Sequence, residues 1–207
     1  MTILEALYSS DGGSAVAAEL SSDGEKYTLF CLSEDYAEIK GSLKKGPIDD
    51  ELLETIRGLD SRCRALRKGR SLLEFGCNSR NGLILKLRKR GFSGESAEFA
   101  ADRLMSEKII NEDRDALREA ERMVSSGFGR KRIISSLYTK GYGREAVSSV
   151  YEKLDEYDFS EICRDVIIKK WRKFPEDPDT GKRAIAALMR LGFSSSEIRS
   201  GIKKSMK

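Results

Sequence analysis

The sequence predicts a mainly α-helical protein made of tandem three-helix repeats, with a small N-terminal head that contains a β-hairpin. Three observations predict this class. The 207 residues include only three prolines, and 35% of them are charged, against roughly 25% in an average domain. One helical segment recurs after 50 and then 51 residues. The first 33 residues instead alternate apolar and polar side chains, as strands do.

The strands of the head are predicted over residues 3–8, 15–20 and 26–33. Asp11-Gly12-Gly13 and Ser22-Asp23-Gly24-Glu25 separate them. Asp-Gly between alternating runs predicts a type I′ turn, because both central residues of that turn need a positive φ. Three short strands bury little by themselves, so we expect the head to pack on neighbouring helices.

Two short helices are predicted to complete the head, which we place at residues 1–60. The first covers residues 34–42. Lys45-Gly46-Pro47 is expected to break the chain, and Asp49 to cap a second helix that ends near residue 57.

The repeated segment ends a helix with a glycine and an aromatic residue. It reads Leu87-xxx-Gly91-Phe92, Leu137-xxx-Gly141-Tyr142 and Leu188-xxx-Gly192-Phe193. Glycine adopts a left-handed conformation at no Cβ cost, and the aromatic can then pack back on the helix. Ser93 and Ser194 are predicted to cap the following helix, the second in a capping box with Glu197.

A further helix is predicted ahead of each pair, at residues 62–74, 114–125 and 161–174. Each unit therefore has three helices in about 50 residues, a length typical of stacked repeats that share a core. We place the repeats at residues 61–108, 109–158 and 159–207.

Charge is distributed unevenly. Residues 1–60 carry 5 Lys and Arg against 13 Asp and Glu, whereas residues 61–207 carry 33 against 21. Residues 61–90 alone carry ten basic residues and one acid. Such a basic stretch favours a polyanionic partner, since each neutralised phosphate releases condensed counterions. The alternative is a well-solvated helical surface.

Several function classes have no support in the sequence. The chain has no histidine, so a Ser-His-Asp triad, a Cys-His pair and a His-ligated zinc are excluded. Its four cysteines form no CxxC motif, and we expect them to be reduced and mostly buried. We predict no catalytic residue, no metal and no cofactor. Without a long apolar segment or a signal peptide, we expect a cytoplasmic monomer that contacts no membrane.

The candidate binding residues are four groups of cations. They are Arg64, Arg67 and Lys68; Lys86, Arg88 and Lys89; Arg130, Lys131 and Arg132; and Lys169, Lys170, Arg172 and Lys173. Cations such as Lys89 that end a helix also stabilise its dipole, which is the alternative explanation there. The Arg130 group begins a helix, where cations oppose the dipole, so local energetics give no reason for it. We expect alanine at these three positions to weaken binding and leave thermal stability unchanged.

Other candidates are weaker. Trp171 offers a surface for base stacking, but its helical spacing from Ile167 and Ile168 favours the core. The carboxylate pairs Glu112/Asp113 and Asp177/Asp179 suggest a nuclease only loosely. Gly127-Phe128-Gly129-Arg130 lacks the Gly-Lys-Ser/Thr ending of a phosphate loop.

The ordered set of motifs resembles the RecX family, small bacterial proteins that regulate the RecA recombinase. The resemblance covers nearly the whole chain. It is carried by Leu66, Arg70-Ser71, Leu87-Arg88-Lys89-Arg90-Gly91-Phe92, Ile110-Asn111-Glu112, Ala116, Gly127-Phe128-Gly129-Arg130-Lys131-Arg132-Ile133, Leu137 and Lys140-Gly141-Tyr142. The head, with Leu32-Ser33-Glu34-Asp35-Tyr36 and Leu43-Lys44-Lys45-Gly46-Pro47, is similar to the N-terminal extension of RecX from Gram-positive bacteria. Glu112 and Asp115 depart from the usual family pattern.

The resemblance implies a regulator that lies in the groove of the RecA–single-stranded DNA filament. There it would restrain strand exchange, ATP turnover and co-protease activity, in homologous recombination, DNA repair and the SOS response. It implies RecA and single-stranded DNA as partners, with weaker binding to duplex DNA.

The alternative is a DNA-binding helix-turn-helix protein that acts without RecA. The acidic starts of the helices after Gly91 and Gly141 argue against it, because they would repel phosphates.

Overall fold

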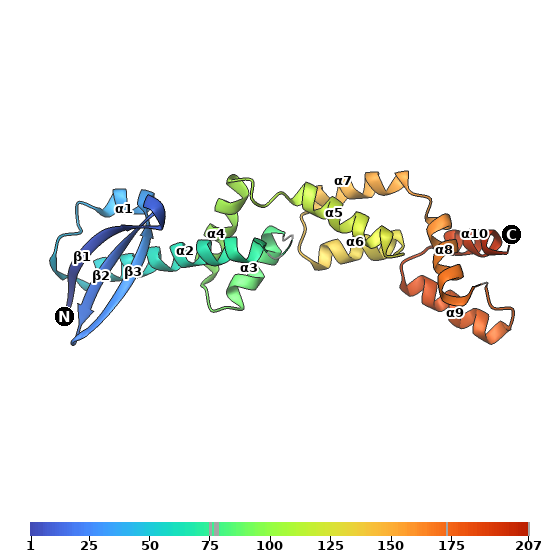
Figure 1. Ribbon diagram of the computed structural model, residues 1–207, viewed down its shortest axis with the longest axis horizontal. Helices are drawn as coiled ribbons and strands as arrows, with labels where there is room; N and C mark the ends of the chain where they lie inside the picture. Colours follow the sequence, from blue (N-terminus) through green and yellow to red (C-terminus); the bar gives the residue numbers. More distant parts are fainter. Residues whose placement is uncertain (75, 77–78, 173, 207) are drawn as a thin grey trace. The chain divides into compact units, whose positions relative to one another are not determined.

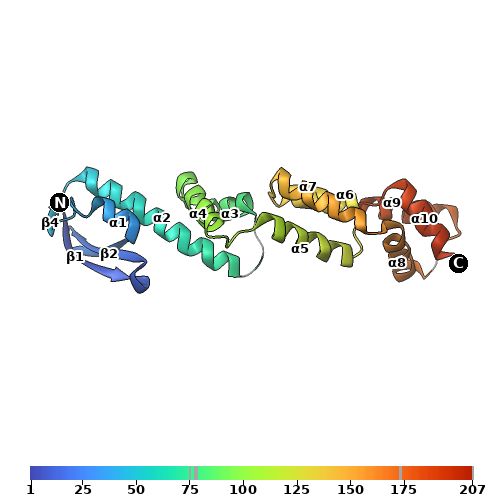
Figure 2. The same cartoon turned by 90° about the horizontal axis from the view of Figure 1, so that it is seen from above.

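The computed structural model describes residues 1–74, 76, 79–172 and 174–206 (Figures 1 and 2). Its strands are β1 (Thr2–Ser10), β2 (Ala15–Ser22), β3 (Glu25–Leu32) and β4 (Gly46–Ile48). Its α-helices are α1 (Ser33–Ile39), α2 (Asp50–Glu74), α3 (Arg80–Arg88), α4 (Gly94–Ser106), α5 (Glu112–Ser125), α6 (Arg130–Thr139), α7 (Arg144–Lys153), α8 (Phe159–Trp171), α9 (Pro178–Arg190) and α10 (Ser195–Ser205). Short 3₁₀ helices lie at Asp11–Gly13 (η1) and Leu154–Glu156 (η2). The predicted class, helical repeats with a small N-terminal sheet, is confirmed.

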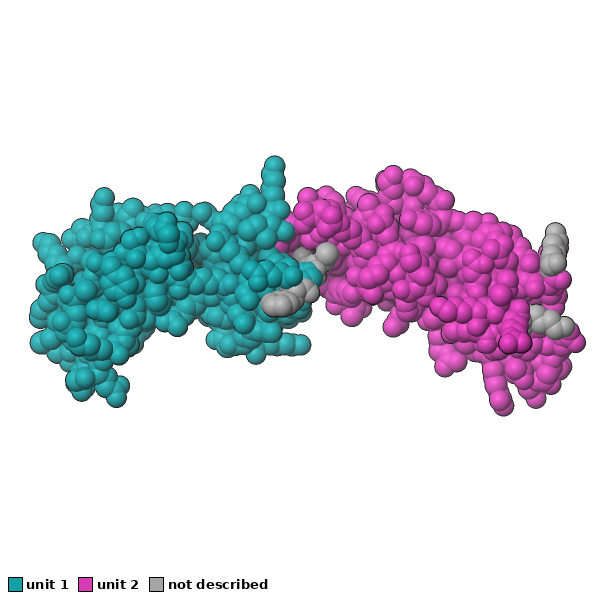
Figure 3. Space-filling model, in the orientation of Figure 1, with its two compact units in different colours: residues 1–76, 83–109 teal, residues 77–82, 110–207 magenta. Residues whose placement is uncertain are grey.

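The chain forms two compact units (Figure 3). Unit 1 comprises residues 1–76 and 83–109, and unit 2 comprises residues 77–82 and 110–207. Helix α3 contributes its first residues to unit 2 and the rest to unit 1. The finer division into a head and three repeats stays a prediction. Among the described residues, no helix combines the length and the apolarity that a bilayer span needs.

The sheet of unit 1 is antiparallel, with strand order β3-β2-β1-β4. The predicted hairpin turn between β2 and β3 is confirmed, since Asp23 and Gly24 have φ values of 52° and 84°. Strand β4 was not predicted, because its three residues contain Pro47 and were expected to be a break. Pro47 is tolerated because β4 is an edge strand that pairs with β1 alone.

The sheet packs on the first half of α2, as Figure 2 shows. Leu4, Ala18 and Leu20 from the sheet share a core with Leu53 and Ile56 from α2. The head therefore depends on a helix for its core, as predicted from the shortness of its strands.

Helix α2 corrects one expectation. The sequence predicted two helices, one ending near residue 57 and one starting at residue 62, but the structure has a single helix of 25 residues. Its buried positions include Ile56, Asp60 and Cys63, which continue one helical stripe across the expected break. The sequence did not predict this continuity, because the charged Asp60 occupies a position where the apolar pattern of a buried helix face requires an apolar residue.

The predicted repeat turns are present. Gly91, Gly141 and Gly192 follow α3, α6 and α9 with φ values of 90°, 83° and 97°. In each turn the glycine N–H donates to the carbonyl three residues back, and the following aromatic N–H donates to the carbonyl five residues back. This is the Schellman pattern, which satisfies carbonyls that the helix leaves free. The predicted caps at Ser93 and Ser194, including the capping box, are also present.

In unit 2 the middle helices of the repeats meet end to end. The Gly129 N–H, at the start of α6, donates to the Leu191 carbonyl at 2.8 Å, and the Lys131 N–H donates to the Gly192 carbonyl at 3.2 Å. A Cβ on Gly129 would lie 2.4 Å from the Gly192 carbonyl carbon. The start of α6 therefore sits directly on the turn that ends α9.

The same contact occurs between the start of α3 and the turn after α6. The Ser79 hydroxyl donates to the Lys140 carbonyl at 2.6 Å and accepts from the Gly82 N–H at 2.9 Å. A Cβ on Gly141 would lie 3.0 Å from the Cβ of Asn81. We call each of these two contacts an end-to-end joint.

The joint at α6 makes a testable prediction. Gly129 has an ordinary φ of −80°, so alanine would be penalised by close approach alone, and we expect Gly129→Ala to lower the free energy of unfolding by about 2 kcal/mol or more. The matched control is Gly143→Ala, at the start of α7. Its Cβ would lie 3.0 Å from a side-chain oxygen of Glu112 and, among the described residues, within 4 Å of no backbone atom of another segment, so a smaller loss of about 0.5–1 kcal/mol is expected. Equal losses in urea denaturation would contradict the joint.

Candidate functional site

Two predicted binding cations of α2, Arg64 and Arg67, contact the head. The Arg64 Nε donates to Asp60 at 2.6 Å, and an Arg64 terminal nitrogen donates to the Thr28 carbonyl at 3.2 Å. Asp60 also accepts the Phe30 N–H at 2.7 Å. Because β3 is an edge strand, these side chains cover an edge that would otherwise present unpaired backbone groups.

Arg67 of α2 also contacts the head. Its guanidinium stands 4.4 Å from the centre of the Phe30 ring and pairs with Asp11 of η1. A cation over an aromatic face is attracted by the ring quadrupole, more so when it is partly desolvated. Both arginines therefore hold the sheet against α2.

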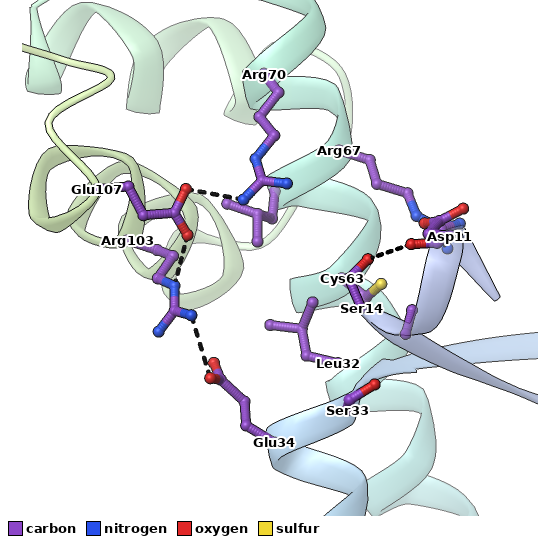
Figure 4. A pocket seen from close by; sticks show the side chains of 12 residues that line it. Asp11, Ser14, Leu32, Ser33, Glu34, Cys63, Arg67, Arg70, Arg103 and Glu107 are labelled. Carbon is purple, nitrogen blue, oxygen red and sulfur yellow. Dashed lines mark hydrogen bonds and ion pairs between the residues drawn. The ribbon is translucent and has the colours of Figure 1, made fainter. Parts of the chain in front are cut away.

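The same region contains a cavity of about 250 Å³, shown in Figure 4. Arg103 of α4 bridges Glu34 of α1 at 3.1 Å and Glu107 at 2.8 Å, and Arg70 reaches Glu107 at 2.8 Å. Burial by itself raises the pKa of Glu107, but hydrogen bonds from Arg103 and Arg70 outweigh it and hold that pKa below its usual range. Glu34 of the head and Glu107 of the first repeat thus neutralise cations of the first repeat.

Arg130 is also structural. It is half-buried at the start of α6 and pairs with Asp155 at 2.5 Å, and it donates to the Leu154 carbonyl at 3.0 Å. Its guanidinium lies 5.2 Å from the ring centres of both Tyr151 and Phe159. These contacts argue against the expectation that alanine at position 130 leaves thermal stability unchanged.

Lys131 and Arg132 are exposed, but the sequence argument about them needs correction. Cations at a helix start oppose that helix's dipole, so local energetics were expected to give no reason for them. In the structure the start of α6 meets the carbonyl end of α9 at Leu191 and Gly192. The negative end of α9 therefore stands beside these two cations and offsets the repulsion.

The remaining candidates that the structure describes are exposed. Within the described residues, the ones with no ion pair are Lys68, Arg88, Lys89, Lys131, Arg132, Lys169, Lys170 and Arg172. Lys86 is exposed and has an interaction of its own. Lys173 lies outside the described residues. The candidates therefore divide into three arginines that hold the fold and a larger set that faces solvent.

Trp171 packs against the core of unit 2, as its spacing favoured, and the Lys170 ammonium lies 5.9 Å from the centre of its ring. The Glu112 carboxylate accepts from the N–H groups of Arg80 and Gly143, at the starts of α3 and α7. Asp177 caps α9 by accepting from the Thr180 N–H at 2.8 Å. One carboxylate of each suggested nuclease pair therefore has a structural role.

Three cysteines, Cys31, Cys63 and Cys163, are buried and unpaired, as expected. Burial is the main cause that raises the pKa of Cys31 to about 11 and that of Cys163 to about 12. These thiols are protonated at neutral pH, which disfavours nucleophilic or metal-binding use. Cys77 lies outside the described residues. The described residues hold no cluster of three or more metal-ligating side chains.

Sequence reasoning missed the end-to-end joints and the covered edge of β3. A signal for the joints was present. Small residues, Ser79 and Gly129, occupy the same repeat position, four residues before the buried Leu83 and Ile133. The cover on β3 left no such signal, because Asp60 and Arg64 contact residues 30 or more positions away.

Arg130 gives a direct test of this division. We expect Arg130→Ala to lower the free energy of unfolding by about 1–3 kcal/mol, since it leaves the Leu154 carbonyl and two aromatic rings without their cation. The matched control is the double substitution Lys131→Ala and Arg132→Ala, which we expect to change stability by about 0.5 kcal/mol or less. Urea denaturation measures both. A double variant less stable than Arg130→Ala would contradict the assignment.

No family model matches the chain. Among curated proteins it is similar to regulatory protein RecX of Xanthomonas axonopodis pv. citri (strain 306), with 32% identity over 127 residues, which is 61% of this chain and 78% of that protein. RecX of Pseudomonas putida is 31% identical over 136 residues, 65% of this chain and 86% of the relative. Both relatives are named as regulators, not as enzymes.

The fold is similar to two crystal structures. One is of a regulatory protein RecX, with a TM-score of 0.72 and 18% identity over 99% of this chain and 100% of that one. The other, RecX from Lactobacillus salivarius, has a TM-score of 0.58 and 16% identity, and covers 71% of this chain and 97% of its own. The identity and coverage of the curated relatives decide the assignment: the chain belongs to the RecX family of regulatory proteins.

Proposed function

We propose that this protein binds the RecA–single-stranded DNA filament and inhibits its ATP turnover, strand exchange and co-protease activity. The proposal follows from membership in a family of regulators together with the family resemblance of the motifs. It places the protein in the cytoplasm, in recombination, repair and the SOS response. We also propose that the protein acts as a monomer without a cofactor. Its N-terminal head is proposed to correspond to the N-terminal extension of RecX from Gram-positive bacteria.

The observation that carries the DNA part of the proposal is that most of the candidate cations are exposed and have no ion pair among the described residues. Those assigned to DNA lie in all three predicted repeats, at Lys68, at Lys131 and Arg132, and at Lys169, Lys170 and Arg172. Cations spaced along a chain of repeats suit an extended polyanion, because each contact adds to the release of counterions.

The absence of ion pairs at these cations among the described residues also favours binding of a partner over stabilisation of the fold. Holding a long, flexible cation in one place costs side-chain entropy, and an exposed ion pair recovers little of it. A cation that stabilises the fold is therefore expected to be partly buried and paired, as Arg67 and Arg130 are. Lys131 and Arg132 have neither feature.

The helix-turn-helix alternative receives no support from α4, the helix that would read bases. Ser96 and Ala97 near its start are buried, and Glu95 pairs with Arg62. A recognition helix needs exposed side chains at its start.

Titration of RecA-driven ATP hydrolysis on single-stranded DNA tests the proposal. We expect this protein to lower turnover at concentrations too low to coat the DNA. The double reversal Lys131→Glu and Arg132→Glu should weaken inhibition by about tenfold or more at low salt, since it replaces two phosphate-binding charges with repelling ones.

The matched control for this titration is Arg199→Glu with Lys203→Glu, two exposed cations of α10. It changes net charge by the same amount, so it should alter inhibition by no more than about twofold if local contact is what matters. Unchanged ATP turnover at saturating wild-type protein would refute the proposed function. Equal losses in both variants would refute the assignment to Lys131 and Arg132.

A further inference from the structure

The end-to-end joint is periodic. Counting from the repeated glycine, Ser79 and Gly129 occupy the same position of successive repeats, and so do Lys140 and Leu191. The donor at position 79 or 129 bonds the carbonyl at 140 or 191, at 2.6 Å and 2.8 Å. The carbonyl next to each repeated glycine is thus an acceptor for the start of another helix.

The first repeat has the same turn without this occupant. Gly91 has a φ of 90°, its N–H donates to the Arg88 carbonyl, and the Phe92 N–H donates to the Leu87 carbonyl. In the described part of the chain, no atom of another segment lies within 4 Å of a Cβ built on Gly91. The corresponding distances at Gly141 and Gly192 are 3.0 Å and 2.4 Å. The turn after α3 is therefore an open half-joint, which we define as Lys89, Arg90 and Gly91.

The surroundings of the open half-joint differ in charge from the two occupied turns. Lys140 is neutralised by Glu119, and its counterpart in the third repeat is the apolar Leu191. At the open half-joint, Arg88, Lys89 and Arg90 are exposed and have no ion pair among the described residues. Leu85, one turn before Lys89, is 54% exposed. An exposed leucine beside three cations suits an acidic protein surface better than a phosphate backbone, which offers leucine no apolar contact.

A second copy of this chain does not fit. In a second copy, the helix that would bind the open half-joint is α9, the middle helix of the third repeat. The first N–H groups of α9 already have hydrogen-bond acceptors within the same chain. Asp177 accepts the Thr180 N–H through its side chain and the Gly181 N–H through its carbonyl, both at 2.8 Å. Pro178, at the first helical position, has no N–H to donate.

We propose that the open half-joint receives the N-terminus of an acidic helix from a partner protein. The free N–H groups of that helix would bond the Arg90 carbonyl, as Gly129 bonds Leu191. Asp or Glu in its first turn would pair with Arg88, Lys89 and Arg90, and would favour its own dipole. A small residue, Gly or Ser, is required at its start, because both occupied joints have one there. The inference rests on the proposed function, since it takes the partner to be the protein of the RecA filament.

Photo-crosslinking tests the inference. A p-benzoylphenylalanine side chain is placed at the position of Arg88 in the full-length protein, which is bound to RecA filaments on single-stranded DNA. The matched control carries the same side chain at the position of Met189, the aligned residue before an occupied turn, which is 50% exposed. We expect adducts from position 88 within the first two turns of an acidic RecA helix. Adduct yield from position 189 should be at least about tenfold lower.

Two results would overturn the inference while leaving the proposed function intact. One is inhibition of ATP turnover with adducts only to DNA, to a strand or to the middle of a helix. The other is equal adduct yield from positions 88 and 189. Wild-type protein that leaves ATP turnover unchanged in the same samples would refute the proposed function, and this inference with it. The double reversal Lys89→Glu and Arg90→Glu should raise the half-inhibitory concentration about tenfold, and an unchanged value would also count against the half-joint.

Discussion

The contact on which unit 2 depends is the meeting of one helix end with another. Where α6 begins on the turn after α9, two first-turn N–H groups bond two carbonyls of that turn, so both ends lose groups that would otherwise need water or side-chain caps. The opposite ends of two helix dipoles also lie together there, which lowers the cost of Lys131 and Arg132 at a helix start. Glycine is needed on both sides, because a Cβ on Gly129 or Gly192 would overlap backbone atoms.

Unit 1 is stabilised by ion pairs between side chains, whereas the joint in unit 2 is made by backbone groups. The acidic head neutralises Arg64, Arg67 and Arg103 through Asp60, Asp11 and Glu34. These pairs join segments that are far apart in sequence and cover the open edge of β3. The net basic charge of residues 61–90 therefore overstates what a partner would meet, since part of it is already matched inside the fold. The exposed, unpaired cations carry the proposed interaction with the filament.

Local patterns predicted the parts of the fold that depend on near neighbours. The Asp23-Gly24 turn, the glycine turns at 91, 141 and 192, and the Ser194 capping box were all readable because each needs a particular residue type at a fixed spacing. The continuity of α2, the strand at Gly46–Ile48 and the pairing of Arg64, Arg67 and Arg130 were not readable. Each depends on a partner many residues away, and an arginine that pairs across the fold has no local mark that separates it from one that binds DNA.

Hydrogen exchange of the first-turn amides of α6 tests the end-to-end joint most directly. First-turn amides of an exposed helix have no intrahelical acceptor and exchange readily. The joint predicts that the Gly129 and Lys131 amides exchange about 100-fold more slowly than the Gly94 and Glu95 amides at the start of α4. Similar exchange rates at the four amides would contradict the joint, and with it the open half-joint after α3.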